Sequence, residues 1–514
     1  MKKIKKWTGE TWQNIKKFVK ENPTEFYILA IILLVAAFCR LYRISDYLTF
    51  LGDEGRDVII VRRLLVEGHP PLIGPGTSIG QMYLGPFYYY MMAPALLLAN
   101  FSPIGPAVQI AILGIVTVWL VWFCGREWFG KTAGLIAAGL YAIAPTVIIY
   151  SRSSWNPNIM PFFALLSIYS IWRVWKEREF GWLPVLGFSF GAAMQSHYLA
   201  LLLLPTLGIF WLLTIWKLKI NEKSVFIKNS LFGLGIFIIL MSPLFFFDLR
   251  HNWINSQAIY KFFTVRQETV SIRPWTAIPK LPQILNLVDG SVVAAKNTKA
   301  SIVVSILIFL GVVWVFAKNK FKILPQYWLL ISWIGVGFIG FGLFKQNIYD
   351  HYFGFIFAVP FLLIGSFISM MFEEIKIAKW LGITILVYLV GINLIGNPLR
   401  KEPNRLLKRS IDVSKVIEQN SGGLPFNLAV IADTNYEAGY KYFLLKDNYP
   451  VLDIDPQIPA TITPQLFAVC ELIPSDKCDP THNPKAQITS FGWSKIEGSW
   501  NVDGAIVYKL IHTQ

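Results

Sequence analysis

The chain has 514 residues, of which 54% are hydrophobic and only 15% are charged. Soluble domains carry about 25% charged residues, so this composition excludes an ordinary soluble protein and indicates a chain that lies mostly in a lipid bilayer. The formal net charge of +16 would suggest a nucleic-acid partner in a soluble protein, but here the basic residues mark the cytosolic ends of membrane spans, so we expect membrane lipids and no nucleic acid as partners.

Residues 1–24 carry seven lysines and show no cleavage site, so no cleavable signal peptide is predicted. Five apolar residues of this segment could share one helical face: Ile4, Trp7, Ile15, Phe18 and Val19. We therefore predict that 1–24 forms a cytosolic amphipathic helix on the inner membrane surface, next to anionic lipid headgroups.

Eleven apolar runs of membrane-spanning length follow, since a helix needs about 20 such residues to cross a hydrocarbon core of ~30 Å. The runs lie at 26–44, 106–124, 132–150, 159–175, 181–196, 198–216, 229–247, 300–317, 325–343, 353–371 and 380–396. A twelfth run, 84–101, contains Pro86, Pro94 and three adjacent tyrosines. If this run crosses the membrane, every loop after it lies on the opposite side from where it would otherwise lie.

If 84–101 does not cross, the N-terminus and the loops that then face the cytosol hold 21 lysines and arginines, whereas the short external loops 151–158 and 344–352 hold two. If it does cross, fourteen of those cations become external. The positive-inside rule favours the first arrangement, so we interpret 84–101 as a re-entrant or juxtamembrane helix.

The predicted fold class is therefore a polytopic α-helical membrane protein, with about 11 transmembrane helices plus a juxtamembrane helix. Its N-terminus lies in the cytosol, and its membrane domain covers 25–398, with external loops 45–105 and 248–299. The remaining residues, 399–514, predict a small α/β domain on the extracytoplasmic side, with helices over 404–419 and 436–446 and strands at 427–432, 466–471 and 505–511.

Two of the four cysteines, Cys470 and Cys478, lie eight positions apart in the predicted C-terminal domain. Outside the cytosol they could form a disulfide or remain free thiols, and the sequence leaves both open. Their spacing does not indicate a zinc site.

Two adjacent carboxylates, Asp53 and Glu54, follow the first apolar run, with Gly52 and Gly55 giving the backbone room to turn. Acidic residues are favoured at a helix N-terminus, where they complement the helix dipole. A carboxylate at the end of a membrane span could instead be a general base. We take Asp53 as the candidate catalytic base, with Glu54 positioning the acceptor or holding Asp53.

The predicted topology gathers further ionisable groups on the same outer face. Arg152 and Arg250 could bind a lipid-linked phosphate through paired hydrogen bonds, and His197 or His251 could assist as donors. The alternatives are interfacial anchors for the two arginines and a turn residue for His197. No charge lies in the middle of a predicted span, which counts against an ion-coupled transporter.

A divalent metal is a further possibility on this face. The candidate ligands on one side of the membrane are Asp53, Glu54, His197, His251 and His351. Their spacing identifies no particular site, so the metal requirement stays open.

Four sequence features occur in a fixed order along the chain. They are the acidic pair in the first external loop, Tyr83-Leu84-Gly85-Pro86-Phe87-Tyr88-Tyr89-Tyr90, then Gly125-Arg126-Glu127-Trp128-Phe129-Gly130-Lys131 between two spans, then Tyr150-Ser151-Arg152. In these features the chain resembles the GT-C superfamily of integral-membrane glycosyltransferases. Within it, the resemblance is to the dolichyl-phosphate-mannose protein mannosyltransferase family and its bacterial relatives, including the aminoarabinose transferase that modifies lipid A. It covers roughly residues 25–300.

The resemblance implies a GT-C-like fold, a polyprenyl-phosphate-sugar donor and an inverting transfer to a hydroxyl acceptor outside the cytosol, with Asp53 as base. Such a transfer needs no general acid, because the phosphate leaves as an anion. The chain departs from the family where Leu84-Gly85-Pro86 replaces a His-Pro-Pro or Lys-Pro-Pro sequence and where Asn156 and Asn158 replace an acidic residue. His69-Pro70-Pro71 lies earlier in the chain. These departures leave the acceptor open.

Two other classes of function remain besides a hexosyl or pentosyl transferase of the cell membrane. In a lipid-linked glycan flippase or another transporter, polar residues would line a path through the bilayer, whereas here they lie on one face of the predicted bundle. An inactive relative could serve as an assembly or binding subunit, with 399–514 as its recognition domain.

Overall fold

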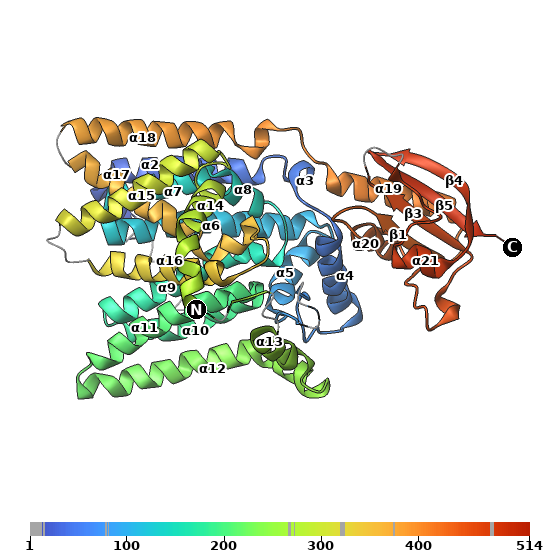
Figure 1. Ribbon diagram of the computed structural model, residues 1–514, viewed down its shortest axis with the longest axis horizontal. Coiled ribbons are helices and arrows are strands. Elements are labelled where there is room, and N and C mark those ends of the chain that lie inside the picture. The colour runs from blue at the N-terminus through green and yellow to red at the C-terminus, as the bar shows by residue number, and fades with distance from the viewer. Residues whose placement is uncertain are drawn as a thin grey trace.

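The computed structural model describes residues 13, 16–77, 80, 82–265, 269–271, 273–318, 324–373, 376–472 and 477–513. Most of the amphipathic helix predicted over 1–24 lies outside these residues. Figure 1 shows a long bundle of helices with a small domain of strands and helices at one end.

Seven helical segments of the described chain are long and apolar enough to cross a membrane, and each coincides with a predicted run. They are α2 (Pro23–Leu41), α6 (Ile104–Phe129), η3 with α11 (Tyr198–Leu202 and Leu203–Trp216), α12 (Ile220–Arg250), α15 (Thr298–Lys318), α16 (Pro325–Leu343) and α18 (Lys376–Ile395). An eighth candidate bends by 60° at the break between η5 (Asp350–Ile356) and α17 (Ala358–Glu373).

The other three predicted spans are also helical: α9 keeps its predicted length of 17 residues, whereas the other two are shorter or interrupted. The run 132–150 is interrupted at Pro145, which lacks a backbone N–H and disfavours a helical conformation for the residue before it. The three runs form α7 (Lys131–Ile143) with α8 (Pro145–Tyr150), α9 (Met160–Lys176) and α10 (Leu183–Ser196). The polytopic helical fold is confirmed: among the described residues, seven or eight helices are long and apolar enough to cross a membrane, and the other three predicted spans are present as shorter helices.

The run 84–101 contains one short helix, α5 (Phe87–Leu98), with 12 residues. At 1.5 Å per residue it rises about 18 Å, which is too short for a hydrocarbon core of ~30 Å. It packs against α6 and against α4 (Gly52–Glu67). This length agrees with the predicted juxtamembrane or re-entrant helix.

Close approach of α6 and α7 holds the middle of the bundle together. A Cβ atom on Gly134 would lie only 2.6 Å from the Trp122 carbonyl oxygen, and small residues let membrane helices approach in this way. Shorter elements connect the long helices: α3 (Ile44–Tyr47), η1 (Asn156–Ile159), η2 (Phe180–Trp182), α13 (Ile254–Thr264), η4 (Pro274–Lys280), α14 (Leu281–Val292) and η6 (Pro398–Arg400).

The C-terminal domain contains a five-stranded sheet in the order β2-β1-β3-β5-β4. β1 is parallel to β2 and β3, whereas β5 is antiparallel to β3 and β4. The strands are β1 (Phe426–Ile431), β2 (Val451–Leu452), β3 (Gln465–Cys470), β4 (Ser494–Val502) and β5 (Ala505–His512); the helices are α19 (Leu406–Asn420), α20 (Ala438–Lys446), η7 (Pro459–Thr461) and α21 (Ala486–Phe491). β1 and β3 are buried throughout, because α19 and α20 cover one face of the sheet and α21 covers the other.

The three strands and two helices predicted in this domain are confirmed to within two residues at each end. The elements β2, β4 and α21 were not predicted. Cys470 and Cys478 form a disulfide, with Cα atoms 6.0 Å apart, which settles the question that the sequence left open.

Candidate active site

Glu54 serves as a helix cap at the start of α4. Its Oε2 accepts a hydrogen bond from the Leu51 backbone N–H at 3.0 Å, which satisfies one of the donors left free at a helix start. The side chain is buried, and this burial raises its pKa to about 8. The helix-start interpretation is therefore right for Glu54, although the residue also lines the cavity described below.

We predict that Glu54→Gln changes how stability depends on pH. Between its ordinary pKa of 4.5 and about 8, the folded protein keeps a proton that the unfolded chain releases, so this carboxyl lowers stability as pH rises through that window. The amide oxygen of glutamine can still accept the Leu51 hydrogen bond. The apparent melting temperature of the variant, relative to wild type, should therefore rise from pH 5 to pH 9. A difference that stays constant with pH would contradict the burial of a protonated Glu54.

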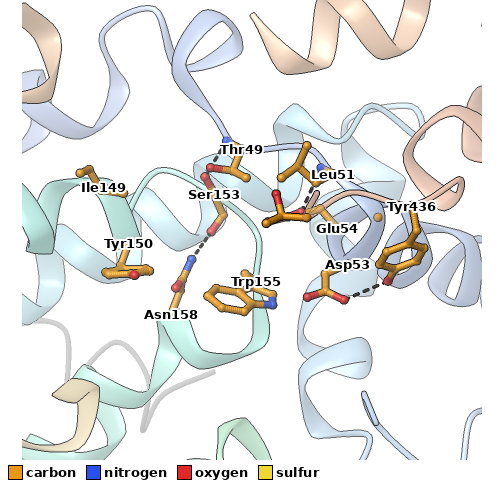
Figure 2. A pocket seen from close by; sticks show the side chains of 12 residues that line it. Thr49, Leu51, Asp53, Glu54, Ile149, Tyr150, Ser153, Trp155, Asn158 and Tyr436 are labelled. Carbon is orange, nitrogen blue, oxygen red and sulfur yellow. Dashed lines mark hydrogen bonds between the residues drawn. The ribbon is translucent and has the colours of Figure 1, made fainter. Parts of the chain in front are cut away.

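Asp53 is half-exposed and is held from one side only. Its Oδ1 accepts hydrogen bonds from Arg56 Nη1 and from the Tyr436 hydroxyl, each at 2.9 Å. Figure 2 shows its other oxygen pointing toward Trp155, away from Tyr436. One carboxylate oxygen of Asp53 is thus fixed in place while the other faces the space between Asp53 and Trp155.

Arg56 and Asp57 form a second layer behind Asp53. The buried Asp57 Oδ1 accepts hydrogen bonds from Arg56 Nε at 3.0 Å, Arg56 Nη2 at 2.8 Å and the Tyr89 hydroxyl at 3.2 Å. Burial raises the pKa of Asp57 to about 6, and Arg56 opposes this change. Sequence reasoning missed this layer, although an arginine three positions after Asp53 on a helix faces the same side.

The space in front of Asp53 is a cavity of about 290 Å³. Its walls come from the start of α4, from the segment 149–158 and from the loop between β1 and α20 in the C-terminal domain (Figure 2). The lining residues are Thr49, Leu51, Gly52, Asp53, Glu54, Ile149, Tyr150, Ser153, Trp155, Asn158, Thr434 and Tyr436. Hydroxyl, amide and aromatic groups make up most of this lining, which suits an uncharged polyhydroxyl group beside the carboxyl groups of Asp53 and Glu54.

Arg152 lies at the end of α2 and does not line this cavity. Its Nη1 donates to the Cys39 carbonyl at 2.6 Å and its Nη2 to the Tyr42 carbonyl at 2.7 Å. A cation at a helix C-terminus satisfies the free carbonyls there and complements the helix dipole. The structure thus gives the buried Arg152 a helix-capping contact, which neither of the two sequence interpretations included.

His197 lies behind the cavity wall. Its Nδ1 accepts the Leu199 N–H at 3.1 Å, and burial lowers its pKa to about 3, so the ring is neutral and can offer only Nε2–H as a donor. The ring centroids of His197 and His351 are 5.9 Å apart, and those of His351 and the cavity residue Trp155 are 4.7 Å apart. The turn interpretation of His197 therefore describes its contacts well.

Arg250 and His251 lie at the end of α12, and neither is among the described residues that line the cavity. Both are exposed. The His251 ring stacks on Phe247 with centroids 4.1 Å apart, and its Nδ1 lies 2.8 Å from the Phe247 carbonyl oxygen. The structure does not bring these two residues into the Asp53 cavity.

The candidate metal ligands do not gather into one site in the described part of the chain, where no group of three or more His, Cys, Asp and Glu side chains could hold a metal ion. The asparagines at the two departures from the family pattern make structural contacts instead. Asn156 Nδ2 donates to the Ser196 carbonyl at 2.7 Å, and Asn158 Nδ2 to the Ser153 carbonyl at 2.8 Å.

Comparison with known sequences identifies one family and distant relatives. The profile of the family described as Dolichyl-phosphate-mannose-protein mannosyltransferase matches residues 84–245, which is less than half of the chain. The Protein O-mannosyl-transferase tmem260 of Dictyostelium discoideum is 23% identical over 258 residues, which are 46% of this chain and 30% of that protein. The chain thus matches less than a third of the length of this relative.

Comparison with solved structures covers nearly the whole chain. ArnT of Cupriavidus metallidurans, solved with undecaprenyl phosphate bound, matches with a TM-score of 0.56 and 14% identity over 94% of this chain and 97% of that one. The chain has the GT-C fold. The oligosaccharyltransferase of Archaeoglobus fulgidus, in complex with Zn and sulfate, shares the GT-C fold with a TM-score of 0.51 and 15% identity over 77% of this chain and 55% of that one.

Proposed function

We propose that the chain is an inverting glycosyltransferase that moves a sugar from a polyprenyl-phosphate donor to a hydroxyl group of a protein, lipid or glycan. The acceptor oxygen forms a bond to the anomeric carbon as the bond from that carbon to the phosphate oxygen breaks. The acceptor proton passes to Asp53, and the polyprenyl phosphate leaves as an anion, so no general acid is needed. Attack opposite the departing phosphate inverts the configuration at that carbon.

The observation that carries this proposal is the arrangement of Asp53. Two donors, Arg56 and Tyr436, hold Oδ1 at 2.9 Å each, and the other carboxylate oxygen points into the cavity. A general base must reach the proton that it removes, and this oxygen can do so for a hydroxyl inside the cavity. At about 290 Å³ the cavity is large enough for one sugar ring.

For the donor phosphate we propose Arg250 and His251, which are exposed at the end of α12. Of the other two candidates, Arg152 would first have to release the two backbone carbonyls that it holds, and the ring of His197 is neutral. Arg56 is an additional cation beside the base, and its charge would stabilise negative charge that develops near Asp53.

The names of the relatives support a lipid-linked donor. ArnT was solved with undecaprenyl phosphate, and the Dictyostelium relative is named a protein O-mannosyl-transferase. From the ArnT structure we infer a polyprenyl-phosphate donor for this chain, and from the name of the Dictyostelium relative we infer an acceptor that carries a hydroxyl group.

We also propose a cell-membrane topology with the N-terminus in the cytosol and the C-terminal domain outside. The disulfide between Cys470 and Cys478 supports an oxidising compartment for that domain. Because α20 packs directly on α4, the domain and Asp53 lie on the same side of the membrane. The loop charges and the disulfide thus both favour the extracytoplasmic side of the membrane for the cavity in front of Asp53.

The test is incubation of the purified protein with a radiolabelled panel of undecaprenyl- and dolichyl-phosphate sugars, together with hydroxyl-bearing acceptors. We expect one donor to be consumed and its label to appear on an acceptor. If no donor is consumed under any acceptor condition, the proposal is wrong. Movement of labelled lipid between leaflets, without hydrolysis or transfer, would instead support a flippase.

A further inference from the structure

The C-terminal domain closely contacts the stretch that carries the candidate base. A Cβ atom on Gly52 would lie 2.2 Å from the Tyr436 ring, and one on Gly55 would lie 2.3 Å from the Gly439 backbone nitrogen. Both glycines are helical residues of α4. The prediction that they give the chain room to turn is therefore wrong, because they allow the C-terminal domain to approach the catalytic helix.

Polar contacts at this interface end on the same stretch. The Tyr436 hydroxyl donates to Asp53 at 2.9 Å, and Arg56 Nη1 lies 3.4 Å from that hydroxyl. The neighbouring Asn435 accepts the Gly52 backbone N–H at 2.9 Å and donates to Glu471 at 2.6 Å. Glu471 directly follows the disulfide-bonded end of β3, so these contacts connect Asp53 to the core of the C-terminal domain.

The Tyr436 hydroxyl is suited to hold a carboxylate. Burial raises its pKa, so it stays protonated and acts as a donor. By occupying Oδ1 together with Arg56, it directs the other Asp53 oxygen into the cavity, which Tyr436 and Thr434 also line. Without Tyr436, Arg56 alone would hold Asp53, and the carboxylate could rotate away from the acceptor.

We propose that Tyr436 is a positioning residue for Asp53 and that the C-terminal domain completes the catalytic cavity. This inference rests on the proposed function. It gives the domain a part in the transfer step, beyond recognition of a partner. Catalysis then requires the domain to be docked on α4, since Tyr436 reaches Asp53 only from there.

The test compares two Tyr→Phe variants that each remove one hydrogen bond between the C-terminal domain and the helical bundle. Tyr436 donates to Asp53, whereas Tyr442 donates to the Phe101 carbonyl, outside the cavity lining. We expect Tyr436→Phe to lower kcat about tenfold with an unchanged donor KM, because a hydrogen bond to a charged group is lost. Tyr442→Phe should retain both constants.

A second measurement tests the contact without any donor. Melting temperatures of Tyr436→Phe, Asp53→Ala and the double variant should be non-additive, whereas Tyr442→Phe and Asp53→Ala should add. Additive values for the first pair, or wild-type kcat in an otherwise active Tyr436→Phe protein, would overturn the inference and leave the proposed function standing. A wild-type protein that consumes no donor would overturn the proposed function and with it this role of Tyr436.

Discussion

Asp53→Asn is expected to lower turnover of the polyprenyl-phosphate donor by about 10²–10⁴-fold, the usual contribution of a general base. The asparagine side chain has nearly the same shape and can still accept hydrogen bonds from Arg56 and Tyr436, but its amide cannot take the acceptor proton. The effect should therefore appear in kcat, with little change in the donor KM. Transfer of radiolabelled sugar by purified protein in detergent measures both constants.

Asp46→Asn provides the matched control for Asp53→Asn. Asp46 is also a half-exposed aspartate that pairs with an arginine three positions away, here Arg43 at 2.7 Å, but it does not line the cavity. This variant should turn over donor at the wild-type rate, and both variants should keep the wild-type melting temperature within the small effect of a surface ion pair. Wild-type turnover by Asp53→Asn would rule out Asp53 as the base.

The fold could be predicted where the signal is local. Apolar run length was enough to place the long helices, and loop charge was enough to interpret 84–101, which contains α5, as a segment that does not cross the membrane. Strand β4 was missed because all of its positions are exposed or half-exposed, so it lacks a strong apolar pattern. Its turn was visible in the sequence, since Asp503-Gly504, with φ of 45° and 80°, is a strong signal for a tight hairpin.

The candidate site could be predicted only in part. Asp53 stood out by its position after a membrane span, but its partner Tyr436 lies 383 positions away, and no local pattern connects the two. Arg152 shows a second limit, because a cation at the rim of the bundle suits both a phosphate ligand and a cap on carbonyl groups. The Cys39 and Tyr42 carbonyls that Arg152 holds became apparent only in three dimensions.

Gly55→Ala is expected to lower turnover by about 100-fold, because a misplacement of about 1 Å at a catalytic group can cost that much. The new Cβ would lie 2.3 Å from the Gly439 backbone nitrogen and 2.4 Å from the Ala438 carbonyl carbon, and backbone atoms cannot move aside as a flexible side chain can. The C-terminal domain must then lift from α4, which withdraws Tyr436 from Asp53. Turnover of the labelled donor and protease sensitivity of the domain interface measure the two parts of this effect.

Gly235→Ala is the matched control for Gly55→Ala. Gly235 is also a helical residue, in α12, and a Cβ atom there would meet nothing within 4 Å. Alanine favours a helix over glycine by roughly 1 kcal/mol, so both changes gain helix propensity and only Gly55→Ala meets a clash. If the docked domain holds the base in place, only Gly55→Ala should lose turnover, and only in that variant should protease cleave the domain interface. Wild-type turnover in Gly55→Ala would show that the transfer does not need this contact, because the domain could then shift without moving Asp53 out of position.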